Sequence, residues 1–254
     1  MKLEVMLSVM NLNKKDLDKM NITSKCTVIN QCKKNDFEQY KNFNIYSYNE
    51  MGTSNSRNRA LEHITEDIIL ICDDEVIYSK TYEQDILNEF KNNPHADIII
   101  FNIDSPNRKI RINKKNRRLH FYNILSYSAQ RIAFKKSSIK NIEFNSLFGG
   151  GAKYSSGEDT LFLVDSMKRK IKIYSSTKNI GIVNHQTSTW FKGYTEKYFY
   201  DKGALFTAIS KRFRHILMLQ YLLRHKEVLT NFKLKEAYKI MKKGSNDYIR
   251  NRGW

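Results

Sequence analysis

The sequence predicts an α/β fold with a mostly parallel central sheet and helices on both faces. Five apolar, strand-like runs occur at 3–10, 26–30, 43–48, 68–72 and 97–103. Polar stretches able to form helices lie between these runs, notably at 54–64 and 81–93. Strands that alternate with helices of this length form parallel sheets with right-handed crossovers. The chain has 254 residues, of which 41% are hydrophobic, so it is long and apolar enough to bury a hydrophobic core.

The second half of the chain shows a different pattern. A helix is predicted after Gly157, where two acids in the first turn precede apolar residues. Two short strands are predicted next, and two or three basic amphipathic helices follow. We therefore expect a main domain of two halves, followed by a helical appendage. The two short strands are expected at 171–175 and 180–184. The main domain is expected at 1–193, with halves at about 1–103 and 104–193, and the helical appendage at 194–254.

The charge of the chain favours an anionic partner. Lys and Arg number 44 against 26 Asp and Glu, a formal net charge of +18. The excess is concentrated at 107–118, with seven basic residues, and at 203–254, with twelve basic residues against three acids. The three cysteines favour a reducing compartment. Neither a secretory signal nor a run of about 18 apolar residues is found, so we expect a cytoplasmic protein, either free or peripheral on the inner face of the membrane.

Three acids, Asp73, Asp74 and Glu75, directly follow the apolar run 68–72. In parallel α/β sheets, ligands bind at the carboxyl ends of strands. Magnesium and manganese take oxygen ligands, commonly one or two carboxylates completed by a substrate diphosphate. The triplet therefore indicates a cation site, with an ordinary solvated loop as the alternative.

Three further features carry possible chemistry. Arg57 opens a helix after "GTSNS", where a cation and a helix N-terminus favour an anion. Glu158 and Asp159 follow the glycine-rich stretch 148–157, and a carboxylate there can act as a general base. His185 ends a short apolar run, as a metal ligand or as a hydrogen-bonded structural residue.

Taken in order, these motifs resemble the family 2 glycosyltransferases, enzymes of the GT-A type that use nucleotide-diphosphate sugars. The resemblance runs from about residue 5 to about 190. "LSVMNLN" and "TVINQC" are similar to the family's first two strands, and "GTSNSRNRAL" to its Arg-Asn helix. "ILICDDEVIY" resembles its D-x-D strand end and "GEDTLF" its Glu-Asp base motif.

The resemblance implies a nucleotide-sugar site in the half at about 1–103, with UDP-sugars first among the donors, and an acceptor site in the half at about 104–193. Asn11 and Asn30 would lie against the nucleotide, Asp73 would hold its ribose or base side with Asp74 beside it, and Arg57 would approach the diphosphate. The usual Pro-Thr-Tyr-Asn after the first strand is absent, and Asn30 and Gln31 replace the aspartate that commonly ends the second strand. These departures concern the base contacts more than the fold.

The resemblance also implies the catalytic and metal residues. Asp159 would be the base and Glu158 its acceptor-binding neighbour. Glu75, in place of the usual second Asp, would bind Mn²⁺ or Mg²⁺ together with Asp74 and His185. Transfer would then invert the anomeric carbon.

Several alternatives concern the acceptor and the basic segments. The acceptor would be a glycan, lipid-linked as in capsular, exo- or cell-wall polysaccharide synthesis, or a protein-linked glycan on a surface adhesin. The C-terminal helices, with interleaved Phe213, Leu217, Tyr221 and Leu222, would rest on a membrane surface, cap the core or form a homodimer. The rival class is a basic nucleic-acid-binding protein, although no nucleic-acid motif is found and we expect no nucleic-acid partner.

Overall fold

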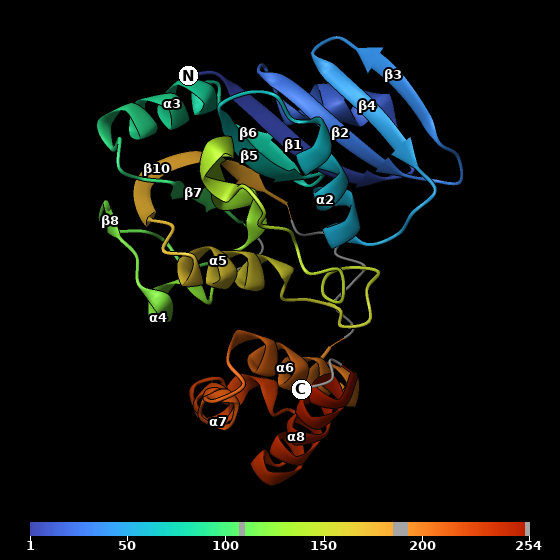
Figure 1. Ribbon diagram of the computed structural model, residues 1–254, viewed down its shortest axis with the longest axis vertical. Coiled ribbons are helices and arrows are strands. Elements are labelled where there is room, and N and C mark those ends of the chain that lie inside the picture. Colours follow the sequence, from blue (N-terminus) through green and yellow to red (C-terminus); the bar gives the residue numbers. More distant parts are fainter. Residues whose placement is uncertain (107–109, 185–192, 252–254) are drawn as a thin grey trace.

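The computed structural model describes residues 1–106, 110–184 and 193–251 (Figure 1). Within them, ten strands form one sheet in the order β3-β4-β2-β1-β5-β9-β7-β10-β6, with β8 paired to β10. The strands are β1 Leu3–Met10, β2 Lys25–Gln31, β3 Asp36–Tyr40, β4 Phe43–Tyr48, β5 Ile68–Asp73, β6 Val76–Tyr78, β7 Ile98–Asp104, β8 Arg117–Arg118, β9 Ile132–Lys135 and β10 Ile173–Val183. The helices are α1 Lys14–Leu17, α2 Thr53–His63, α3 Tyr82–Asn92, α4 Phe121–Ile124, α5 Glu158–Lys168, α6 Glu196–Ile209, α7 Arg214–Arg224 and α8 Leu234–Asn251.

The sheet is mostly parallel, as predicted. Strands β4, β2, β1 and β5 pair with one another in parallel, in that order, and β7 pairs with β10 in parallel. Strand β9 lies antiparallel between β5 and β7, and β3, β6 and β8 pair antiparallel at the margins. The parallel strands bring their carboxyl ends to one edge, where Ser8 of β1 lies opposite Asp73 of β5.

Two cores cover the two faces of the sheet, which explains why the central strands are continuous apolar runs rather than alternating ones. On one face, α2 and α5 pack against residues such as Ile69, Ile71, Ile98 and Ile100. On the other face, α1 and α3 pack against the intervening side chains. Cys26 and Cys72 are buried and free, as expected for core thiols.

The described chain also differs from the expected elements. One strand, β10, replaces the two predicted at 171–175 and 180–184, with irregular pairing to β7 between Ser175 and Ile182. The bulges keep a single extended segment on the sheet where its pattern looked interrupted. Strand β9 was not predicted, because only four residues carry its pattern.

Helices α6, α7 and α8 lie at the end of the molecule below the sheet (Figure 1). Helices α6 and α8 cross closely, since a Cβ on Gly203 would lie 1.9 Å from the Met241 carbonyl oxygen and one on Gly244 would lie 2.0 Å from that of Tyr200. The bundle contacts the rest of the chain through Tyr248 against Phe148 and Tyr154. The division at residue 193 stays a prediction. In the described residues, no helix is both long and apolar enough to cross a membrane.

Candidate active site

The guanidinium of Arg57 lies at the centre of the candidate site. Helix α2 places this side chain under the sheet edge, where it is 2% exposed. It donates to Asp73 Oδ1 at 2.9 Å, to Glu158 Oε1 at 3.2 Å and to Asp159 Oδ1 at 2.7 Å. Its plane also lies over the Phe144 ring, 5.4 Å from the centroid. One cation thus joins the end of β5 to the first turn of α5, two segments more than 80 residues apart in sequence.

The charge of Arg57 is maintained by its partners. Burial disfavours the charged guanidinium, but the nearby Asp73, Asp159 and Glu158 raise its pKa above the ordinary value. The sequence-based expectation was that Arg57 approaches a diphosphate. Because its terminal nitrogens donate to carboxylates, contact with a diphosphate would require one of these ion pairs to open.

Asp159 has the most perturbed carboxyl of the site. Burial first, and then the charges of Glu158 and Asp73, raise its pKa to about 7 against the lowering effect of Arg57. Its Oδ2 accepts a hydrogen bond from the Ala129 backbone N–H at 3.0 Å. A carboxyl that titrates near neutral pH and keeps 22% of its surface exposed can accept a proton from a substrate hydroxyl.

Glu158 lies next to Asp159 and is held by two hydrogen bonds. Its Oε1 accepts from Arg57, and its Oε2 accepts from the Gly157 backbone N–H at 3.0 Å. The two acids occupy the first turn of α5, where the helix dipole favours negative charge.

The acidic triplet continues β5 into a tight turn to β6. Asp73 is the last residue of the strand, and Asp74 and Glu75 form the turn. The pKa of Asp74 is raised, first by desolvation and then by the adjacent Asp73 and Glu75. The Glu75 backbone oxygen accepts from the Asn184 N–H at 3.0 Å, which joins this turn to the end of β10. His185, the third predicted metal ligand, lies outside the described residues.

Asn30 and Asn11 lie at the neighbouring strand ends. Asn30 Oδ1 accepts from the Leu12 backbone N–H at 3.0 Å, and its amide donates to Ser47. Asn11 is exposed with a left-handed φ of 49°, and its N–H donates to the Gln31 carbonyl. Asn30 thus holds the loop that carries Asn11, and both residues lie at the same sheet edge as Asp73.

Sequence reasoning missed two contributors to the site. Ser8 faces the same side of the sheet as Asp73, and its buried hydroxyl has no hydrogen-bond partner among the described residues. The Ala129 N–H reaches Asp159 from the short 3₁₀ turn Ala129–Arg131 before β9. Alternation along β1 from the buried Met6 could have indicated Ser8, whereas no local signal identifies a backbone N–H.

A metal ion requires donors that these residues partly provide. Among the described residues, no group of three or more His, Cys, Asp or Glu is arranged to hold a metal ion. The acids at 73–75 nevertheless supply carboxylate oxygens, and Mg²⁺ is commonly held by one or two carboxylates with substrate phosphates and water. The donor chemistry therefore fits a hard divalent cation shared with a diphosphate.

Solved structures share this fold. Staphylococcus aureus TarS, residues 1–349, in complex with UDP-GlcNAc aligns at a TM-score of 0.68 and 16% identity, covering 98% of this chain and 81% of that one. The mannosyltransferase PcManGT from Pyrobaculum calidifontis, in complex with GDP-Man and Mn²⁺, aligns at a TM-score of 0.56 and 12% identity, covering 99% and 75%. Because the identities are this low, these similarities show the fold alone, which is the GT-A fold.

Sequence comparison with curated proteins finds no significant match. Residues 23–153, more than half of the chain, match the sequence profile of Glycosyl transferase family 2. The matched segment includes Arg57 and the acidic triplet. The chain therefore belongs to glycosyl transferase family 2 and is a glycosyltransferase.

Proposed function

We propose that the protein transfers a sugar from a nucleotide-diphosphate sugar, with UDP-sugars first among the candidates, to a hydroxyl of a glycan acceptor with inversion at the anomeric carbon. The observation that carries the proposal is the Arg57 guanidinium, which holds Asp73 on the donor side and Asp159 on the acceptor side of one site. The TarS structures with UDP-GlcNAc and with UDP support a uridine nucleotide as the first donor to test.

Asp159 is proposed as the general base. It takes the proton of the acceptor hydroxyl while that oxygen forms a bond to the anomeric carbon. The bond from the anomeric carbon to the phosphate oxygen breaks, and the nucleoside diphosphate leaves with the bonding electrons. A single displacement of this kind inverts the configuration. Glu158, held by Arg57 and the Gly157 N–H, orients the acceptor hydroxyl beside the base.

Glu75, Asp74 and His185 are the residues proposed to hold Mn²⁺ or Mg²⁺, and Asp73 is proposed to hold the ribose or base side of the nucleotide. When bound, such an ion supplies positive charge that neutralises the departing diphosphate. Asp73 Oδ1 accepts from Arg57, which fixes the orientation of this carboxylate at the strand end. Asn11, Asn30 and Ser8 are proposed to contact the nucleotide at the neighbouring strand ends.

The acceptor is proposed to be lipid-linked, as in polysaccharide synthesis at the inner face of a membrane. Exposed apolar side chains on one side of α7 support this placement: Ile216 at 63%, Leu219 at 45% and Leu223 at 51% exposure. Basic residues flank them, and an amphipathic helix of this kind can lie on an anionic membrane surface.

The face proposed to meet the membrane differs from the sequence-based expectation. Of the four residues first expected there, Leu222 is fully buried and Leu217 and Tyr221 pack against the core, so only Phe213 is exposed. Phosphatidylglycerol vesicles should bind the protein, and Ile216→Asp with Leu223→Asp should abolish that binding. Phe37→Asp, on the edge strand β3, is the matched control.

Donor hydrolysis tests the central proposal. Purified protein is incubated with UDP-, GDP- and dTDP-sugars in Mn²⁺, Mg²⁺ or EDTA, and release of nucleoside diphosphate is measured. We expect slow, metal-dependent hydrolysis of one donor, lost in Asp73→Asn and Asp159→Asn but retained in Asp165→Asn, a control on the exposed side of α5. No turnover or binding of any donor, together with salt-sensitive DNA binding, would favour the nucleic-acid alternative instead.

A further inference from the structure

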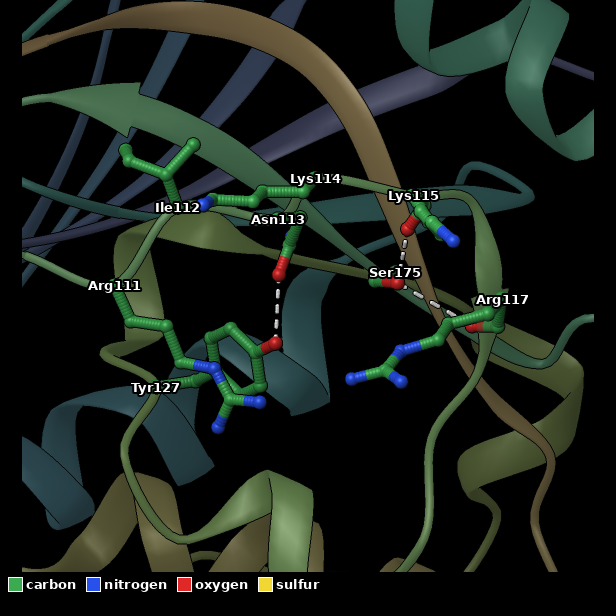
Figure 2. A pocket seen from close by; sticks show the side chains of 8 residues that line it. All are labelled: Arg111, Ile112, Asn113, Lys114, Lys115, Arg117, Tyr127 and Ser175. Carbon is green, nitrogen blue, oxygen red and sulfur yellow. Dashed lines mark hydrogen bonds between the residues drawn. The ribbon is translucent and has the colours of Figure 1, made fainter.

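A basic pocket lies apart from the carboxylate cluster, over the strands β7 and β10. Its volume is about 320 Å³, and the loop between β7 and β8 provides most of its lining (Figure 2). Among the described residues, no acid lines this pocket, and four cationic residues do: Arg111, Lys114, Lys115 and Arg117. Tyr127 and Ser175 complete the lining used below.

The cations of the pocket lack counter-ions within the described residues. Some lysines elsewhere on the protein are paired with a carboxylate, as in Lys41 with Asp18 at 2.6 Å and Lys197 with Asp201 at 2.9 Å. None of the four pocket cations forms an ion pair with a described carboxylate, and four like charges in one concavity repel one another. An anion bound between them would relieve this repulsion.

A fifth cation lies buried beneath the pocket. Arg131 is 1% exposed and, among described residues, its partners are neutral oxygens: Phe101 O at 2.8 Å, Arg111 O at 2.7 Å and Asn102 Oδ1 at 3.1 Å. Its guanidinium and that of Arg111 each lie 5.0 Å from the centroid of the Tyr127 ring. A buried charge without a counter-ion is costly, so its place below a cationic pocket also points to an anionic ligand.

Hydrogen bonds hold the part of the loop around Asn113 and Lys115 in shape. Asn113 N–H donates to Asn102 Oδ1 at 2.7 Å, and the Tyr127 hydroxyl donates to Asn113 Oδ1 at 2.6 Å. The Ser175 hydroxyl of β10 donates to the Lys115 carbonyl at 2.9 Å (Figure 2). The cations are therefore carried by a backbone that is fixed to the sheet. Binding of a ligand would cost little conformational entropy of that backbone.

The pocket lies on the acceptor side of the proposed base. Asn102 follows Ile100 by two residues and Asp73 follows Ile71 by two, so both face the side of the sheet covered by α5. The chain runs directly from Tyr127 in the pocket wall to Ala129, whose N–H donates to Asp159. One short segment, 127–129, thus touches both the pocket and the proposed base.

We infer that this pocket binds a phosphate group carried by the acceptor, next to the sugar that is glycosylated. The identification of the ligand as an acceptor rests on the proposed function, whereas the anion site itself does not. Arg and Lys together suit the several oxygens of a phosphate, and the volume admits a phosphate with part of an attached sugar. The phosphate could belong to a lipid-linked precursor or to a soluble phosphorylated glycan.

Binding of inorganic tripolyphosphate, measured by calorimetry in EDTA, tests the anion site. Lys114→Ala with Arg117→Ala should weaken binding by about tenfold or more, because two charge-assisted contacts are lost. Lys80→Ala with Lys91→Ala, the matched control, removes the same charge on the opposite side of the sheet and should leave binding within about threefold. Equal weakening by both pairs would overturn the inference, because it would reflect overall charge alone.

Further measurements distinguish a lipid phosphate from a soluble one, and test the anion site separately from the proposed transfer. If the pocket pair also loses binding to phosphatidylglycerol vesicles, the phosphate is assigned to a lipid; if vesicle binding persists, it is assigned to a soluble glycan. A single-stranded DNA oligomer that competes more tightly than tripolyphosphate would overturn the assignment to an acceptor. Failure of donor hydrolysis in the unmodified protein would refute the proposed transfer without affecting the binding result.

Discussion

Replacing Asp159 with Asn should stabilise the fold at high pH while abolishing turnover. Moving the carboxyl pKa from 3.8 to about 7 disfavours the ionised form by about 4 kcal/mol, since one pKa unit equals about 1.4 kcal/mol. The pKa is raised in the folded state, so this destabilisation is absent below the unfolded-state pKa and is complete once the pH passes about 7. Asn avoids this cost, and no separate loss of the Arg57 ion pair is subtracted, because the attraction of Arg57 is already contained in the net pKa.

The expected gain for Asp159→Asn is therefore up to about 4 kcal/mol at about pH 8.5, and near pH 4 the substitution should be neutral or destabilising. Urea unfolding at both pH values measures the difference. Asp165→Asn, exposed on the same helix, should change the free energy of unfolding little at either pH. A destabilisation by Asp159→Asn that is equal at both pH values would refute the reasoning, because it would mean that the carboxyl is not perturbed.

Three other outcomes are expected. In a pH–rate profile, turnover should rise as Asp159 ionises and level off above about pH 7; a profile flat from pH 5 to 8 would contradict its role as base. Arg57→Met should destabilise the protein by about 3 to 5 kcal/mol in urea unfolding, since three carboxylates lose their buried cation, and a loss below about 1 kcal/mol would count against the ion-pair centre. Gly203→Ala should cost about 3 kcal/mol, because its Cβ would overlap the Met241 carbonyl; an unchanged thermal midpoint would show that α6 and α8 separate easily.

Much of the sheet could be predicted because its strands carry local signals. The apolar runs at 3–10, 26–30, 43–48, 68–72 and 97–103 correspond closely to β1, β2, β4, β5 and β7. Strand β9 could not be predicted in its central, antiparallel position, since its pairing with β5 and β7 depends on contacts distant in sequence.

The face of α7 shows the same limit. A basic, apolar helix was evident from composition, but Leu222 and Ile216 look alike in sequence. Packing against α6 and α8 buries the first and leaves the second exposed, so only the bundle decides which side chains remain available to a partner.

The sequence by itself determined the family, the order of the motifs and the acids at 73–75 and 158–159, because strand ends and helix starts are encoded by neighbouring residues. Tertiary structure alone decided that Arg57 joins these acids, that burial moves the Asp159 pKa toward neutrality, and that uncompensated cations gather over β7 and β10. The physical reason is that charge interactions and desolvation depend on distance in space, and folding brings together groups that the chain keeps far apart.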